Sequence, residues 1–275
     1  MPLKICGPAV HGQVGDLVGN TVFCRAVKEL YPDCKLTFAI GGKYAKSAFL
    51  FEQNKYIDEI HIWDSYDDFP SQKDLDYIKD QKFDIVFNPR KPHTYQNWYN
   101  YFSYCQEWTL IHGIPTASDL RPYLNPWYHK PNKQKIVTLS AFPGTDLSFN
   151  KSLKIEDWAA ICKYIRNKGY IPIELGGKYA KDIENCERPD LDLMEGCKLL
   201  LDSSLHLSVD CGLGWVAAGY QKNLIGFYTN SQPDMIHPWS HMPVNDNADY
   251  LFYKDIKNNI NLQEIYDLID KKLRD

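Results

Sequence analysis

Short apolar runs alternate along the chain with segments whose apolar residues recur at helical spacing. In the first half, the runs Lys4–Val10, Lys35–Ile40 and Phe83–Arg90 predict buried strands. Leu17–Leu30 predicts an amphipathic helix, because Val18, Val22, Ala26 and Leu30 fall on one face. The same criteria predict a further strand at 59–63, a helix that carries on from the segment Gly41–Lys46 to about Gln53, and a helix near 74–80.

The second half repeats this alternation. Strands are predicted at Lys135–Ala141, Tyr170–Leu175, Leu205–Val209 and Asn223–Phe227, and helices at 155–167, 195–201 and 261–273. Alternating strands and helices imply parallel sheets with right-handed crossovers, so the carboxyl ends of the strands form the ligand-facing edge of each half. The pattern therefore predicts an α/β protein with two Rossmann-like, doubly wound domains facing each other across a cleft.

An internal repeat supports two domains of similar plan. The hexapeptide GGKYAK occurs at Gly41–Lys46 and again at Gly176–Lys181, each time after the second strand of its half. A chance match between two common strand-to-helix turns is the alternative. The segment Ile114–Lys133 contains four prolines and no hydrophobic periodicity, which predicts a linker. We expect domains at 1–118 and 135–275, joined by residues 119–134.

An aromatic-rich stretch lies between Trp98 and His112, and it is predicted to be helical. Its rings cover two faces of that helix rather than one stripe. Core packing is the favoured interpretation, because large aromatic residues are mostly buried. Stacking on sugars or bases in a cleft is the alternative.

Composition narrows the function classes. The 275 residues carry a formal net charge of −4 with a pI near 6.1, so no broad basic field supports non-specific nucleic-acid binding. The eight cysteines are scattered, with no CxxC pair, and are predicted to be reduced core residues. No uninterrupted apolar stretch of about 18 residues occurs. We expect a cytoplasmic protein without a membrane span.

The stretch His206–Tyr228 reads as strand, glycine-containing turn, small-residue helix and strand. Glycines at the start of a helix let backbone N–H groups face a phosphate or another anion. A tight turn without a ligand is the alternative. An Asp-x-Asp pair after a strand and a GxGxxG fingerprint are both absent, so neither a catalytic metal ion nor a dehydrogenase is expected.

Three segments resemble glycosyltransferase family 9, the heptosyltransferase-like enzymes of the GT-B fold. They are GDLVGNTVFCRAVKELYPDCKLTFAI (15–40), NKSLKIEDWAAICKYIRNKGYIPIELGG (150–177) and VDCGLGWVAAGYQKNLIGFY (209–228). Asp16, Lys151 and the Asp210-Cys211-Gly212 turn match the family pattern. Cys211 replaces the usual serine, and Trp215 stands where the family has histidine.

The resemblance implies a metal-independent, inverting glycosyltransferase that uses a nucleotide-diphosphate sugar as substrate and needs no cofactor. Asp16 would be the general base, with helix N-capping as the alternative. Lys151 would neutralise the donor phosphates, unless Lys154 does so. The remaining donor-side candidates are Gly144, Thr145, Glu174, Gly176, Asp210, Cys211, Gly212, Leu213 and Gly214. The acceptor-side candidates are His11, Asn88 and Arg90.

Other functions stay open at this point. A different GT-B activity, such as a nucleotide-sugar epimerase or a transferase acting on nucleic acid or protein, would use the same scaffold. The departures at Cys211 and Trp215 also fit a catalytically silent sugar-nucleotide binding protein. For a transferase, a glycan or lipid-linked glycan is the expected acceptor.

Overall fold

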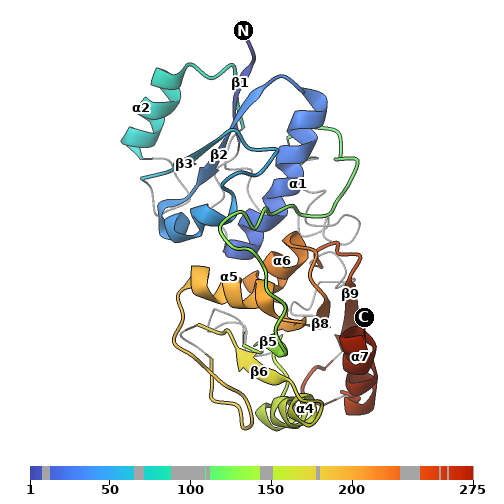
Figure 1. Ribbon diagram of the computed structural model, residues 1–275. Helices are drawn as coiled ribbons and strands as arrows, with labels where there is room; N and C mark the ends of the chain where they lie inside the picture. The colour runs from blue at the N-terminus through green and yellow to red at the C-terminus, as the bar shows by residue number, and fades with distance from the viewer. Residues whose placement is uncertain are drawn as a thin grey trace. The chain divides into compact units, whose positions relative to one another are not determined.

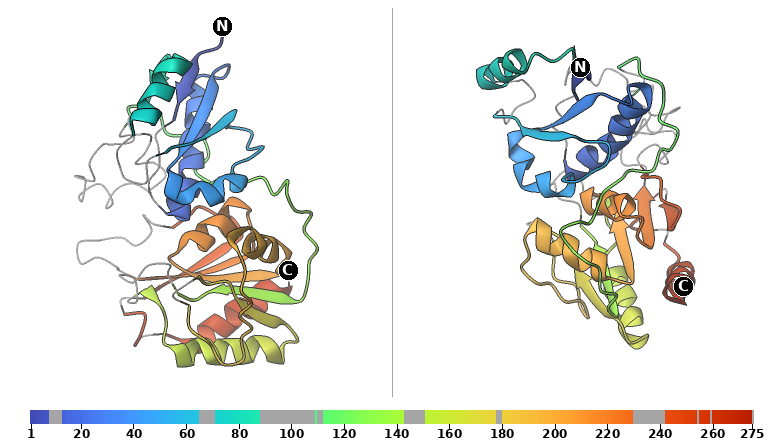
Figure 2. Two further views of the ribbon diagram at one scale, coloured as in Figure 1. Left: turned by 90° about the vertical axis from the view of Figure 1, so that its left-hand side faces the viewer. Right: turned by 45° about the horizontal axis from the view of Figure 1, so that its top comes forward.

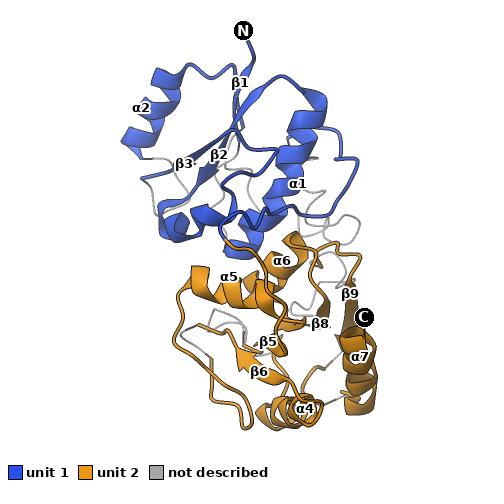
Figure 3. Cartoon of the chain, in the orientation of Figure 1, with its two compact units in different colours: residues 1–128 blue, residues 129–275 orange. Residues whose placement is uncertain are grey.

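A computed structural model of the chain contains two compact units, residues 1–128 and 129–275 (Figure 3). The structure describes residues 1–7, 13–64, 71–87, 109, 112–142, 151–177, 180–229, 242–253, 255–258 and 260–274. The division between Tyr128 and His129 falls inside the expected linker, residues 119–134.

Unit 1 contains a parallel sheet in the order β3-β2-β1-β4 (Figure 1). Its strands are β1 (Lys4–Cys6), β2 (Lys35–Ile40), β3 (Glu59–Ile62) and β4 (Ile85–Val86). Its helices are α1 (Val14–Leu30), the 3-10 helix η1 (Gly42–Leu50) and α2 (Gln72–Gln81). The direction of winding reverses between β1 and β4, which is the position where doubly wound sheets bind ligands.

Burial in unit 1 is concentrated in strand β2 and helix α1. Strand β2 is buried from Leu36 to Ile40, because helices cover both of its faces. On one face, Ile78 of α2 packs against Ala39 and Trp63. Helix α1 is buried along most of its length, and Phe23 packs edge-on against Phe87 with ring centroids 5.1 Å apart.

Unit 2 contains a parallel five-stranded sheet in the order β6-β5-β7-β8-β9. Its strands are β5 (Ile136–Ser140), β6 (Ile171–Glu174), β7 (Leu205–Val209), β8 (Leu224–Thr229) and β9 (Ala248–Tyr253). Its helices are α4 (Ile155–Asn167), α5 (Leu193–Asp202), α6 (Gly212–Gly219) and α7 (Leu262–Arg274). The reversal in this unit lies between β5 and β7.

The two faces of the unit 2 sheet are covered by different helix pairs. Figure 2 (left) shows α4 and α7 on one side and α5 and α6 on the other. The first side is the larger apolar core, in which Trp158 of α4 and Ile265 of α7 are fully buried. On the second side, Leu200 of α5 and Ala217 of α6 pack with Leu224.

Most predicted elements are present, and three boundaries are confirmed without change: β2, β7 and α4. Strand β9 was not predicted. The helix expected after β2 is a 3-10 helix that ends at Leu50, and the second GGKYAK copy opens no helix in its described residues. The predicted N-cap position of Asp16 is wrong, since α1 begins at Val14 and its N-cap is Gln13.

Within the described ranges, no helix combines the length and apolar character that crossing a bilayer requires. The predicted aromatic helix around residues 98–112 lies outside the described residues except for Thr109 and His112. All cysteines that the structure describes are free, and five of these seven are buried. The expectation of reduced core cysteines therefore holds for these five.

Replacing Gly226 of β8 by alanine should lower the free energy of unfolding by about 1–3 kcal/mol, through overpacking. A Cβ there would lie 2.6 Å from Tyr250 Cδ1 and 2.8 Å from Tyr228 Cε2. Gly196→Ala in α5 is the matched control: its Cβ would meet no atom within 4 Å, and alanine favours the helix by about 0.5–1 kcal/mol. Urea denaturation followed by circular dichroism compares the two. Equal stability of both variants would contradict the close packing at Gly226.

Candidate functional site

The carboxyl ends of β5 and β7 meet at the reversal point of the unit 2 sheet. The two strands are neighbours in parallel register, with Ser140 opposite Ser208. The loop that starts at Ala141 and the turn that starts at Asp210 therefore leave the sheet side by side. A ligand that binds at the switch point of such a sheet contacts these two connections first.

Lys151 and Asp210 form an ion pair across these connections, with Nζ 2.6 Å from Oδ2. The side chains are 27% and 17% exposed, so the pair is reachable from solvent. Lys151 is held in place by its neighbours: Ser152 Oγ donates to the Ala141 carbonyl at 2.6 Å, and Leu153 is buried in the core. The structure thus brings two of the predicted site residues, Lys151 and Asp210, into direct contact.

The turn after β7 leads into α6, whose N-cap is Cys211. Burial raises the pKa of the Cys211 thiol, against a hydrogen bond with Ser208 and hydrogen bonds from the backbone N–H groups of Gly214 and Leu213. Those N–H groups therefore face the sulfur at the start of the helix. Gly214 is needed for close packing, because a Cβ there would lie 2.7 Å from Ser208 Oγ.

The position at which the family has histidine is occupied by Trp215, which is 6% exposed and belongs to the inner residues of α6. Gly212 and Leu213 are half-buried at the first turn of this helix. The side chain at position 215 therefore serves the packing of unit 2.

Glu174, at the end of β6, is almost fully buried, with 1% of its surface exposed. Both of its carboxyl oxygens accept from the Ala141 N–H, at 3.1 and 3.3 Å, and Gly176 supplies a second backbone donor. Burial raises the pKa of Glu174 to about 8 despite these hydrogen bonds. Gly176 has no room for a side chain, because a Cβ would collide with the Glu174 carboxyl group.

Tyr228 of β8 is a site residue that the sequence interpretation missed. Its side chain is 3% exposed; burial raises its pKa well above the usual value, and nearby Asp210, Tyr250 and Cys211 add to the shift. Strand alternation explains its position: Phe227 packs edge-on against Trp158 on the α4 face, so Tyr228 points to the opposite face. That alternation was the available signal.

Asp16 lies in unit 1, at the third position of α1 and after the carboxyl end of β1. Its Oδ2 accepts from the Gln13 N–H at 2.5 Å, and the Gln13 side chain accepts in return from the Asp16 N–H. This reciprocal capping box fixes the carboxylate at the start of the helix, on the edge where β1 and β4 diverge.

The other predicted site residues cannot be placed, because they lie outside the described residues: His11, Asn88, Arg90, Gly144 and Thr145. Among the residues that are described, no three His, Cys, Asp or Glu side chains come together as a potential metal site. The described donor-side candidates form two adjoining groups, one around Lys151 and Asp210 and one around Glu174 and Gly176.

Stability should fall as pH rises from about 5 to about 8, because folding raises the pKa of Glu174 from 4.5 to about 8. The folded state then holds a proton that the unfolded chain has lost, and the unfolding free energy decreases across this window. The expected loss is on the order of 3 kcal/mol. Glu174→Gln removes the titrating group, so its stability should change less over the same range. Denaturant unfolding at pH 5 and pH 8 measures both, and parallel pH profiles for the two proteins would contradict this explanation.

The match to a known protein family covers most of unit 2. Residues 128–263 match the model of glycosyltransferase family 9 (heptosyltransferase). No curated protein sequence matches the chain.

Solved structures of this family share the fold at low sequence identity. The glycosyl transferase family 9 protein from Veillonella parvula superposes with a TM-score of 0.72 at 13% identity, over 99% of this chain and 97% of the other. E. coli ADP-heptose lps heptosyltransferase II gives 0.70 at 12% identity, over 100% and 99%. E. coli heptosyltransferase WaaC with ADP gives 0.61 at 11% identity, over 100% and 98%. With two parallel α/β sheets, a family match across unit 2 and these shared folds, the chain contains a glycosyltransferase family 9 domain and has the GT-B fold.

Proposed function

We propose that the protein transfers a heptose-class sugar from an ADP-sugar to a hydroxyl group of a lipid-linked glycan, without a metal ion and with inversion at the anomeric carbon. The Lys151–Asp210 pair at the switch point of unit 2 is the observation that carries this proposal. The choice of donor and acceptor follows the matched proteins, one an ADP-heptose lps heptosyltransferase and another described with ADP.

Lys151 is proposed to bind the donor diphosphate. When the bond to the sugar breaks, negative charge develops on the departing nucleotide diphosphate, and an ammonium group beside it stabilises that charge. The side chain is 27% exposed and is anchored through Ser152, so its amine can reach a ligand while its backbone stays fixed. In this role Lys151 supplies positive charge that a metal ion provides in other transferases.

Asp210 is proposed to accept hydrogen bonds from hydroxyls of the donor sugar. It starts the turn next to Lys151, so the sugar and the diphosphate would bind side by side. Tyr228, close to Asp210, would form the floor beneath them. Glu174 and Gly176 are proposed to flank the nucleotide ribose, with Glu174 holding the Ala141 backbone in place.

Asp16 is proposed as the general base in unit 1. Its carboxylate would take the proton of the acceptor hydroxyl as the oxygen attacks the anomeric carbon and the nucleotide diphosphate leaves. A single displacement of this kind inverts the configuration at that carbon. The capping box with Gln13 fixes the orientation of the carboxylate. The side chain therefore does not have to change rotamer before it accepts the proton.

Lys151→Met should weaken ADP binding about 10- to 100-fold, because the variant loses a charge-assisted hydrogen bond to the diphosphate and such a bond typically contributes that factor. Lys154→Met is the matched control: Lys154 is exposed at the N-cap of α4, and its loss should leave the affinity nearly unchanged. Isothermal titration with ADP measures all variants. Because Lys151→Met leaves Asp210 uncompensated, the double variant Lys151→Met/Asp210→Asn separates lost attraction from added repulsion. Unchanged affinity in both Lys151 variants would refute the assignment.

Asp16→Asn should lower kcat about 10²- to 10⁴-fold while ADP affinity stays constant, since the base acts on the acceptor and not on the nucleotide. Asparagine keeps an oxygen that can accept from the Gln13 N–H, so α1 should start normally. Asp33→Asn, at an exposed position of the same unit, controls for the loss of one negative charge. The assay follows ADP release from ADP-heptose with truncated lipopolysaccharide as acceptor. Full activity of Asp16→Asn would rule out Asp16 as the base.

A further inference from the structure

Two cysteines outside the proposed donor site pack in the same apolar core of unit 2. Cys162 of α4 is fully buried and belongs to the larger apolar core, and Cys186 in the segment after β6 packs against the same core. The neighbouring Cys186 thiol, together with burial, raises the pKa of the Cys162 thiol. Cys186 is half-buried.

The backbone around Cys186 is held firmly against α4 and β6. Cys186 N–H donates to the Ile183 carbonyl at 3.1 Å, which closes a β-turn with Asn185 in the left-handed region at φ 65°. Arg166 Nε, one helical turn beyond Cys162, donates to the Asn185 carbonyl at 2.6 Å. Glu187 N–H donates to the Pro172 carbonyl at 2.9 Å. These contacts hold the turn that carries Cys186 against α4, the helix that carries Cys162.

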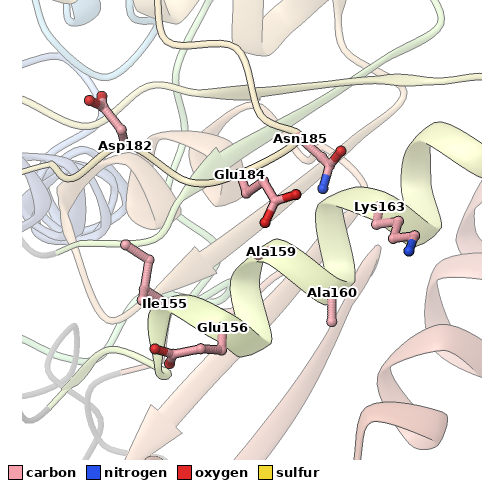
Figure 4. A pocket seen from close by; sticks show the side chains of 8 residues that line it. All are labelled: Ile155, Glu156, Ala159, Ala160, Lys163, Asp182, Glu184 and Asn185. Carbon is pink, nitrogen blue, oxygen red and sulfur yellow. The ribbon is translucent and has the colours of Figure 1, made fainter.

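Small solutes can approach this turn from solvent. A hollow of about 450 Å³ lies between α4 and the turn (Figure 4). Its floor includes Ala159 and Ala160 of α4, and Glu184 and Asn185, the two residues before Cys186, form its other wall. Of the two cysteines, Cys186 is the more exposed, and Cys162 is buried in the core.

We propose that Cys162 and Cys186 are a redox modification site that hydrogen peroxide converts to a disulfide. The thiolate of Cys186 attacks peroxide, the O–O bond breaks, and Cys186 sulfenic acid and hydroxide form. The Cys162 sulfur then attacks the sulfenic sulfur; the S–S bond forms, the S–O bond breaks, and the leaving hydroxide takes up the Cys162 proton as water. Two thiols and one peroxide give one disulfide and two waters, with both electrons passing from sulfur to oxygen.

The disulfide would tie α4 to the segment that follows Glu174 and Gly176. It closes a loop of about 25 residues, a length for which cross-links stabilise the folded state mainly by restricting the unfolded chain. The oxidised protein should therefore melt on the order of 5 °C higher than the reduced protein. This site depends only on the fold of unit 2 and not on the proposed donor or base.

Peroxide treatment of the purified full-length protein tests the proposal. The thiols that can be alkylated after denaturation should fall from eight to six, and dithiothreitol should restore them. Tryptic peptides 155–163 and 182–198 should appear as one cross-linked species, with fragment ions assigning the link to Cys186 and not to Cys197. The melting temperature should rise in parallel.

Three variants complete the test. Cys186→Ser and Cys162→Ala should each abolish the cross-link and the rise in Tm, and the half-buried position of Cys186 makes its variant the safer one to fold. Cys197→Ala, at a buried cysteine of α5, should retain both effects. The proposal would be overturned if all eight thiols of the wild type could still be alkylated after peroxide treatment, or if the cross-link joined other cysteines. It would also be overturned if Cys186 were oxidised to sulfinic acid while Cys162 could still be alkylated.

Discussion

Parallel pairing of β5 with β7 is the constraint on which the candidate site depends. Since the register ends both strands at the same level, Ala141 and Asp210 leave the sheet together. Ala141 then joins three segments: its N–H donates to Glu174 of β6, and its carbonyl accepts from Ser152, next to Lys151. Lys151 in turn reaches Asp210. One backbone position thus fixes both groups of candidate donor-side residues.

The sheet of unit 2 also separates its two faces by chemistry. One face supplies apolar residues to the core with α4 and α7, and the opposite face carries Thr138, Ser140, His206 and Ser208 under α5 and α6. His206 is fully buried there, burial lowers its pKa to about 3, and its Nδ1 lies 3.0 Å from Thr138 Oγ1. The uncharged polar side chains of this face therefore lie under the start of α6. Gly214 lets the helix approach Ser208 closely there, because it has no side chain.

Hydrophobic periodicity predicted the strand-helix order well, because β2, β7 and α4 are buried elements with strong local patterns. It missed β9, whose sequence ADYLFY lies at the edge of the sheet and is fixed by its pairing with β8. Residue type suggested Lys151, Asp210 and Glu174. It did not show that Glu174 is buried or that Tyr228 lies near Asp210, since both depend on contacts between strands. The position of Asp16 was wrong by one helical turn because Gln13 is an uncommon N-cap.

The central claim is that the nucleotide of the donor binds at the carboxyl edge of the unit 2 sheet, where β5 and β7 diverge. A crystal structure of the full chain with ADP tests it most directly. The account predicts a diphosphate within hydrogen-bonding distance of Lys151 Nζ, beside the Asp210 turn. A diphosphate held by other residues, with the Lys151–Asp210 ion pair undisturbed, would contradict it.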